Sequence, residues 1–443
     1  MSVEVTETGL NLIPAGYKQT EVGVIPKDWK VVTLGDIGQT VVGLTYSPDN
    51  VADFGTLVLR SSNVQNGKLA YADNVYVNME LPERVIVKQG DILICVRNGS
   101  RQLIGKCALI DQNAEGNAFG AFMSIFRTNY SLFVFYQFQS NLIQNQINEI
   151  MGATINQITN KDMSGFKIVL PSNEKEQTAI ANALSDVDTL ISKLENLIAK
   201  KQAIKTATMQ QLLTGRTRLP QFALREDGSK KSTKQSELGE IPEDWEVKKI
   251  VDITSCTAGG TPNTSISKYW GGTNPWMSSG ELHLKNVFDV TERITDDGLA
   301  NSSTKYVPIN SVLIGLAGQG KTRGTVAITR ISLCTNQSIA SIFPSKNHSS
   351  EYLYYNLDSR YEELRGLSTG DGGRGGLNLT IIRNLSLPLP CIEEQTAIAT
   401  ILSDMDEEIQ ALEQRLSKTR QIKQGMMQEL LTGKTRLVEG ENG

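Results

Sequence analysis

The chain has 443 residues and a formal net charge of −4 at pH 7, so it can hold two or three domains with their own cores, and the charge weighs against a uniformly basic coat for nucleic acid. Only two histidines occur, His283 and His348, which argues against a histidine-based metal centre or a Ser-His-Asp site. The five cysteines are scattered and form no Cys-x-x-Cys pair. We therefore expect buried small hydrophobes, no disulfide framework and no metal site.

The N-terminal segment, residues 1–24, begins with polar and acidic side chains and carries no charged stretch followed by an apolar run. No stretch elsewhere in the sequence is apolar over the length that a membrane span needs. These two features predict a soluble, cytoplasmic protein.

The first globular region is predicted for residues 25–172. A strand-like run at 91–96 enters a polar, glycine-containing loop at 97–101, and a second β-rich run follows at 106–110. Helix signals are confined mostly to the late part of the region, at 133–151. This order predicts a mixed α/β domain.

One long helix is predicted for residues 173–215. Apolar residues recur three and four positions apart, at Leu184, Val187, Ile191, Leu194 and Ile198. Acidic residues crowd the first turns, basic residues the last, and Gly215 follows as a stop signal. About 38 residues at about 1.5 Å each give a rod about 57 Å long.

A linker is predicted at 216–240, because its stretch 222–234 is polar and has no apolar period. The same order of parts then returns as a second globular region (241–391), a second long helix (392–433) and a tail (434–443). The second region repeats the pattern of the first with a strand-like run (311–316), a polar loop (318–323), a β-rich run (325–331) and late helix signals (350–366). It too is predicted to be mixed α/β.

The two halves form an internal duplication. Ile-Pro-Lys-Asp-Trp at 25–29 returns as Ile-Pro-Glu-Asp-Trp at 241–245. About 25 of about 44 positions in the two helical segments are identical, more than shared helical composition would produce. We expect the equal rods to pair as an antiparallel coiled coil, which would give the molecule pseudo-two-fold symmetry. The alternatives are pairing across a homodimer and packing of each helix on its own globular domain.

Residues 315–322 satisfy the G-x-x-x-x-G-K-T phosphate-loop pattern, but their context argues against that function. A phosphate loop needs a helix that starts at the Lys-Thr, because helix N-terminal amides cradle the phosphates. Here a strand-like run follows instead. We interpret the segment as the counterpart of the loop at 97–101.

The paired loops carry side chains that suit duplex DNA. Arginine donates bidentately to guanine, asparagine and glutamine pair with adenine, and glycine allows close approach. A second, weaker pair of candidate loops lies at 152–157 and 372–378. The candidate DNA contacts are Arg97, Asn98, Arg101, Lys106, Gln157, Gln319, Lys321, Arg323, Arg374 and Asn378. For each the alternative is a solvated hairpin tip or a flexible surface turn.

Catalytic motifs are missing from the sequence. It contains no N-P-P-Y or D-P-P-Y stretch for amino-methyl transfer, no F-x-G-x-G cofactor loop and no convincing acidic pair with lysine for nuclease chemistry. No catalytic residue is predicted.

Three duplicated motifs resemble the specificity subunit of type I restriction-modification systems. They are the Glu-Gln-Thr-Ala-Ile-Ala openings at Glu176 and Glu394, the Leu-Leu-Thr-Gly-[Arg/Lys]-Thr-Arg-Leu closings at Leu212 and Leu430, and the Ile-Pro-x-Asp-Trp motifs at Ile25 and Ile241. Together they span nearly the whole chain. The resemblance implies two target-recognition domains, each reading one half of a split DNA site. It also implies helices that hold two methyltransferase subunits and, through them, the motor-nuclease subunits.

The resemblance further implies that this chain is not itself an enzyme. S-adenosylmethionine, ATP and magnesium would be used by partner subunits. The family fixes no base-contacting residue, because its recognition domains diverge. The alternative from another class is a non-enzymatic coiled-coil scaffold or adaptor with two protein-binding domains. DNA binding that weakens steeply with salt distinguishes the two.

Overall fold

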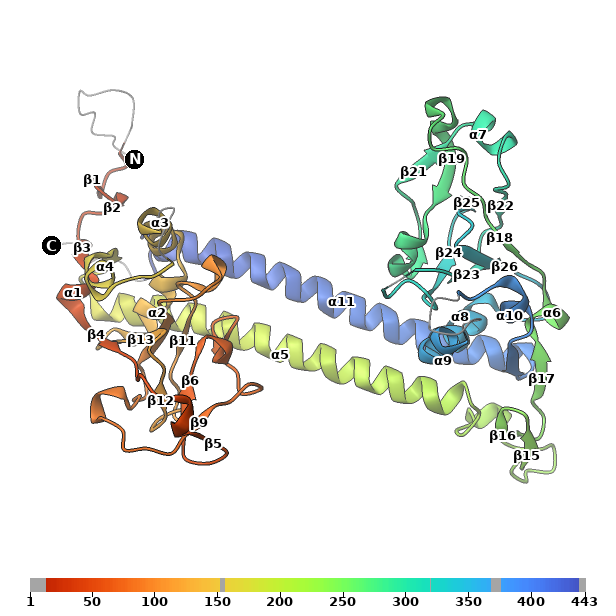
Figure 1. The fold of residues 1–443 in the computed structure, drawn as a ribbon, viewed down its shortest axis with the longest axis horizontal. Helices are drawn as coiled ribbons and strands as arrows, with labels where there is room; N and C mark the ends of the chain where they lie inside the picture. Colours follow the sequence, from red (N-terminus) through yellow and green to blue (C-terminus); the bar gives the residue numbers. More distant parts are fainter. Residues whose placement is uncertain (1–12, 152–155, 319, 368–375, 438–443) are drawn as a thin grey trace. The chain divides into compact units, whose positions relative to one another are not determined.

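The computed structural model describes residues 13–151, 156–318, 320–367 and 376–437. The chain divides into two compact units: unit 1 comprises residues 1–195 and 415–443, and unit 2 comprises residues 196–414. Two helices of 39 residues each, α5 (Glu174–Leu212) and α11 (Ile392–Leu430), contribute one part to each unit (Figure 1).

Unit 1 is built around two sheets with the strand orders β11-β10-β13-β4 and β12-β6-β9-β5. Its strands are β1 (Tyr17–Thr20), β2 (Gly23–Pro26), β3 (Lys30–Thr33), β4 (Gly38–Val42), β5 (Val51–Ala52), β6 (Thr56–Leu59), β7 (Val64–Gln65), β8 (Lys68–Leu69), β9 (Tyr76–Val77), β10 (Ile92–Cys95), β11 (Cys107–Leu109), β12 (Ala118–Phe119), β13 (Met123–Thr128) and β14 (Lys167–Leu170). Its short helices are α1 (Leu34–Ile37), α2 (Ser131–Gln139), α3 (Asn141–Ile150) and α4 (Asn160–Gly165).

The strand β10 separates the two cores of unit 1. Successive side chains of a strand point to opposite faces, so Ile92 and Ile94 join the core that includes α2 and α3. Leu93 and Cys95 join the core beneath the second sheet. A strand buried on both faces reads as a continuous apolar run, which is why the run at 91–96 predicted it correctly.

Unit 2 repeats this plan with the strand orders β18-β26-β23-β24-β20 and β21-β19-β25-β22. Its strands are β15 (Thr233–Ser236), β16 (Gly239–Pro242), β17 (Glu246–Lys249), β18 (Cys256–Ala258), β19 (Trp270–Met277), β20 (Asn286–Val287), β21 (Glu292–Ile294), β22 (Tyr306–Val307), β23 (Val312–Gly315), β24 (Val326–Thr329), β25 (Leu333–Thr335), β26 (Ile339–Ile342) and β27 (Ser386–Leu389). Its short helices are α6 (Ile250–Ile253), α7 (Asp296–Ala300), α8 (Ser350–Ser359), α9 (Tyr361–Gly366) and α10 (Leu379–Arg383). The prediction of mixed α/β regions is confirmed in both units.

Within each unit the two long helices exchange ion pairs in antiparallel order. In unit 1, Asp188 pairs with Lys423 and Glu195 with Arg420, each at 2.7 Å. In unit 2, Lys201 pairs with Glu408 and Lys205 with Asp406. In both units, residue numbers rise along α5 as they fall along α11.

The first turns of each long helix also pack on the globular region that precedes them. Ile180 and Leu184 of α5 are buried in the unit 1 core together with Leu430 and Leu431 from the end of α11. The opening of α11 is buried in unit 2 in the same way. The sequence alternative in which each helix packs on its own domain therefore applies to these turns.

A buried ionic junction fixes the start of α5 in unit 1. The Glu176 carboxylate is fully buried, accepts a hydrogen bond from the Trp29 indole at 3.1 Å and is paired with the Arg436 guanidinium. Arg436 also donates to Asp28, at 3.0 and 2.8 Å, and lies over the Trp29 ring. Hydrogen bonding to Glu176 raises the pKa of Arg436, so the Arg436 guanidinium stays positively charged.

Unit 2 contains the same junction with Arg218 as its guanidinium. Arg218 donates to Glu394 at 2.7 Å and to Asp244 at 2.7 Å, and the Trp245 indole donates to Glu394 at 3.1 Å. Burial alone would raise the pKa of Asp244, but hydrogen bonds from Arg218 and Lys231 outweigh it and hold the pKa at about 2. The three motifs that repeat in the sequence therefore meet in each unit.

The glycine of each closing motif is required by the same junctions. Gly215 and Gly433 have φ angles of 73° and 72°, which other residues rarely adopt. An added Cβ would overlap the ring of Pro242 at Gly215 and the ring of Pro26 at Gly433. Both glycines follow the last helical residue, as the sequence predicted.

Three smaller observations bear on the sequence predictions. The linker is exposed at 224–230 as predicted, but it forms a short hairpin closed by a bridge between Leu224 and Lys230. Arg225 of this hairpin pairs with Glu243, beyond the linker, at 2.7 Å. Four cysteines are buried, whereas Cys391 is exposed because it directly precedes α11, so the expectation was wrong for this residue. Over the described residues, no helix combines the length and the apolar character that crossing a membrane requires.

Candidate nucleic-acid interface

The loops of unit 1 that carry the candidate DNA contacts meet at one edge of its sheets. Backbone amides tie them together: Leu44 donates to Phe119 at 2.7 Å, Gly120 to Leu59 at 3.0 Å, and Val96 to Phe122 at 3.0 Å. We call residues 44–46, 60–62, 97–101, 120–123 and 156–157 loop cluster 1. Most of these loops follow the ends of strands β4, β6, β10 and β12.

Three sequence-predicted residues are brought together in loop cluster 1. The backbone of Arg97 pairs with that of Gln157 in an isolated bridge, and both residues are exposed. The Asn98 amide donates to the Ser61 hydroxyl at 3.1 Å, which joins the loop after β10 to the loop after β6. Arg97, Asn98 and Gln157 therefore belong to one surface.

Arg101 is a fourth candidate in loop cluster 1, at its margin, whereas Lys106 lies outside the cluster. The Arg101 guanidinium donates to the Asn148 carbonyl at 3.2 Å, near the C-terminus of α3, where a helix attracts positive charge. Lys106 is exposed at the start of β11, on the far arm of the hairpin. Beneath the loop, burial raises the pKa of the Cys95 thiol to about 11, so it is a neutral packing group rather than a nucleophile.

A pocket of about 600 Å³ opens inside loop cluster 1. Its lining residues are Leu44, Thr45, Tyr46, Arg60, Ser61, Ser62, Asp73, Gly120, Ala121, Phe122 and Met123. The Phe122 side chain is 57% exposed, although it is aromatic, and the Arg97 guanidinium lies 5.3 Å from its ring centroid. An exposed ring with a cation over it is suited to stacking against a planar ligand.

Unit 2 holds its loops with the same backbone hydrogen bonds. Gly260 donates to Thr335 at 2.8 Å, Asn336 to Met277 at 3.0 Å, and Leu316 to Ser338 at 2.8 Å, in the order found in unit 1. A further matching pair is Ile158 to Val96 at 2.8 Å in unit 1 and Leu377 to Leu316 at 2.9 Å in unit 2. We call residues 260–262, 278–280, 317–318, 320–323, 336–338 and 376–378 loop cluster 2.

Three of the five candidate residues of unit 2 are among the described residues. Lys321 is exposed, and its carbonyl accepts a hydrogen bond from the Tyr361 hydroxyl at 3.0 Å. Arg323 is half-buried in the same loop. Asn378 caps α10, because its Oδ1 accepts from the Ile381 amide at 2.9 Å. Gln319 and Arg374 lie outside the described residues.

The segment that matches the phosphate-loop pattern is a hairpin loop. The strand β23 before it pairs antiparallel with β24 after it, through Leu313 and Ala327 among others. The strand predicted at 325–331 is therefore confirmed, and the helix that a phosphate loop requires after Lys321 is replaced by a turn and a strand.

The aromatic and polar residues of the pocket were not predicted from the sequence. Tyr46, Arg60, Asp73 and Phe122 come from separate loops, and no spacing in the sequence connects them. A weak signal existed in Phe122, which is a large apolar residue between the glycine at position 120 and a strand.

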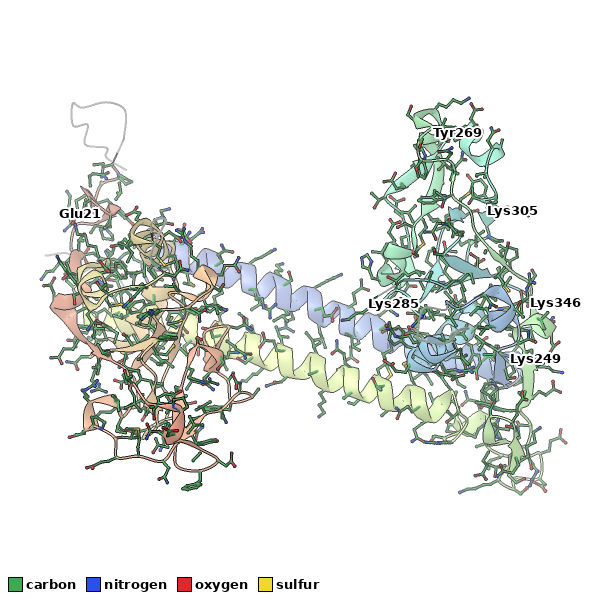
Figure 2. All side chains as sticks on the ribbon, viewed as in Figure 1. Glu21, Lys249, Tyr269, Lys285, Lys305 and Lys346 are labelled. Atoms are coloured by element: carbon green, nitrogen blue, oxygen red, sulfur yellow. The ribbon has the colours of Figure 1, made fainter. Side chains whose placement is uncertain are left out.

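Two lysines of unit 2, Lys249 and Lys285, lie on opposite sides of the unit (Figure 2). The Lys285 amine contacts Val326 of β24 and pairs with Asp358 at 2.6 Å.

Comparison with known proteins gives a match in each half of the chain. A family model described as the type I restriction modification DNA specificity domain matches residues 26–206 and 242–422. Each match takes in most of one globular region and most of the long helix that follows it.

Some relatives match the chain over both halves, and others match a shorter stretch. The type I restriction enzyme MjaVIII specificity subunit of Methanocaldococcus jannaschii is 25% identical over 430 residues, 93% of this chain and 94% of the relative. The MjaIX specificity subunit of the same organism is 34% identical over 182 residues, 40% of this chain and 41% of the relative. A solved type I restriction-modification S subunit from M. genitalium matches with a TM-score of 0.58 at 16% identity. The match covers 91% of this chain and 96% of that subunit, and it shows a likeness of fold.

Proposed function

The chain belongs to the family of type I restriction-modification DNA specificity proteins, and we propose that it is the sequence-reading subunit of such a system. Each unit would bind one half of a bipartite target in duplex DNA. The complete target would then be defined by two separate surfaces of one chain.

The observation that carries this proposal is the pair of loop clusters. Matching backbone hydrogen bonds hold both clusters, while the side chains at matching positions differ: Arg97 corresponds to Ala317, and Phe122 corresponds to Ser338. Base edges are read by side chains, whereas a common backbone frame only positions them. Two such clusters suit two readers of different sequences.

We assign the long helices the role of spacer and docking surface. The recognition domains would be residues 25–172 and 241–391, and the helices, 173–215 and 392–433, would pair as an antiparallel coiled coil. The antiparallel ion pairs within each unit support this pairing. Two methyltransferase subunits would dock on the helices, and motor-nuclease subunits would join through them.

We also propose that this chain is non-catalytic. Methylation with S-adenosylmethionine, and ATP- and magnesium-dependent cleavage, would be performed by the partner subunits. The pure chain should then neither methylate nor cut DNA, and methylation should appear when a separate methyltransferase subunit and S-adenosylmethionine are added. Turnover by the pure chain would contradict this assignment.

An electrophoretic shift on random duplex DNA, repeated across salt concentrations, tests DNA binding. Binding through phosphates should weaken steeply as salt rises, because counterions are released. Binding that is absent at low salt would favour the scaffold or adaptor with two protein-binding domains. Sequencing of methylated sites in cells that express the chain with its methyltransferase would give both half-sites.

A further inference from the structure

The pocket of loop cluster 1 contains an arginine whose donors are only partly used. The Arg60 Nη2 pairs with Asp73 at 2.9 Å, and the Arg60 side chain keeps 34% of its surface exposed. The Arg60 Nε is buried without a hydrogen-bond partner, as is the Ser62 hydroxyl beside it. A ligand that enters the pocket therefore meets the exposed part of the Arg60 side chain, whereas Nε itself is enclosed.

A buried asparagine holds both members of the ion pair in place. The Asn63 side chain has no exposed surface; its Oδ1 accepts from the Arg60 amide at 2.9 Å, and its Nδ2 donates to the carbonyls of Ala70 at 2.8 Å and Asp73 at 3.3 Å. Arg60 and Asp73 are therefore anchored by the same side chain, which reduces the freedom that binding must otherwise remove.

In unit 2 the half-buried Glu281 takes the place of Asn63, and Ser278 takes the place of Arg60. There the Glu281 carboxylate accepts from the Ser278 amide at 3.0 Å, as Asn63 accepts from the Arg60 amide. Ser278 follows β19 as Arg60 follows β6, and each strand pairs in parallel with the next strand of its sheet, β25 or β12. The anchored backbone is shared, while the outward side chain changes from a guanidinium to a hydroxyl.

We propose that Arg60 reads a guanine in the half-site bound by unit 1. Asp73 orients the Arg60 guanidinium, which donates to the two acceptors on the major-groove edge of that guanine. The inference rests on the proposed function, since it specifies which residue of the DNA-binding surface selects sequence. A guanidinium fork matches the O6 and N7 acceptors of guanine, so a good bidentate pair favours guanine over the other bases about 10- to 100-fold. Phe122 and Arg97 at the pocket rim would contact the neighbouring nucleotide.

The test maps the methylated sites produced by the complete methyltransferase complex carrying Arg60→Gln, Arg60→Lys or no substitution. With Arg60→Gln, the preference for guanine at one position of one half-site should fall about 10- to 100-fold, and the other half-site should stay unchanged. Arg60→Lys keeps the charge but loses the fork, so it should lose preference at the same position while binding to random DNA is retained. Asp73→Asn should weaken the same preference to a smaller degree.

Lys88→Gln is the matched control, because it removes one exposed positive charge of unit 1 at the opposite end of β10; it should leave the methylated sequence unchanged. An unchanged target in both Arg60 variants overturns the inference. The inference is also overturned if the Arg60 variants lose affinity equally for all DNA sequences and the salt dependence of their binding has a slope lower by about one. That result identifies a phosphate contact. If Arg60→Gln lowers the unfolding midpoint, the methylated sites of the Arg60→Lys and Asp73→Asn complexes test the inference instead. Methylation without sequence preference by the unsubstituted complex would contradict the proposed function itself.

Discussion

At the scale of single residues, His348 shows how packing fixes a protonation state. The Ser345 hydroxyl donates to the Ile253 carbonyl at 2.9 Å, so its oxygen accepts from His348 Nδ1 at 2.8 Å. His348 Nε2 is then the unprotonated nitrogen, and it is buried without a partner. Burial lowers the pKa of His348 to about 4, although Glu351 opposes the shift.

This pKa predicts a pH dependence of stability. The histidine of the unfolded chain takes up a proton as the pH falls through about 6.5, whereas the folded one does so only near pH 4. Stability should therefore fall between these values, by up to about 3 kcal/mol from this residue. Denaturant unfolding from pH 7.5 to 4 measures it. His348→Asn should remove this part of the slope, and His283→Asn, at an exposed site, should retain it; equal slopes in both variants would contradict the prediction.

Lys321 offers a prediction of a different kind at the same scale. Because it is exposed in loop cluster 2, Lys321→Ala should weaken DNA binding and lower the salt slope by about one if the amine contacts a phosphate. Lys249→Ala is the control, since Lys249 is an exposed lysine of unit 2 outside that cluster (Figure 2). Specific ATP binding by the isolated chain that is lost in Lys321→Ala would instead restore the phosphate-loop interpretation.

At the scale of elements, the long helices are held at their ends by the buried junctions. Arg436→Ala would leave the Glu176 carboxylate buried without its cation, which costs about 3 kcal/mol, and Lys434→Ala in the same motif should change stability by less than about 0.5 kcal/mol. Hydrogen exchange should show increased opening of unit 1. Correspondingly, Arg218→Ala should open unit 2 and Arg216→Ala should not. Increased exchange spread equally over both units in either variant would mean that the junctions do not act separately.

These elements show what the sequence could predict. The apolar period and the flanking charges identified both long helices, and the apolar runs at 91–96 and 311–316 identified β10 and β23, because such signals are local. The junctions could not be predicted, since Arg436 and Glu176 are separated by 260 positions and only the folded chain brings them together. The pocket around Arg60 was missed for the same reason: its residues come from several loops whose side chains carry no periodic signal.

At the scale of the whole molecule, the duplication makes the two readers separable. Exchanging residues 30–165 for the matching region of another family member should change one half of the methylated target and leave the other half as it was, because loop cluster 1 lies wholly within that region. Residues 176 and 436 of the junction stay in place in this exchange. Mapping of methylated sites measures the outcome, and a change in both half-sites would show that the units do not read independently.

Arg436, which lies after the end of α11, also has a consequence for the order in which the protein is made. Synthesis proceeds from the N-terminus, and domains generally fold as their residues emerge. All residues of unit 2 have been synthesised once residue 414 is added, whereas unit 1 also needs residues from 415 onward. The domain that is translated first is thus completed last. Until Arg436 emerges, the nascent chain carries Glu176 and Trp29 without their cation, and premature termination between 415 and 436 damages the opposite end of the sequence.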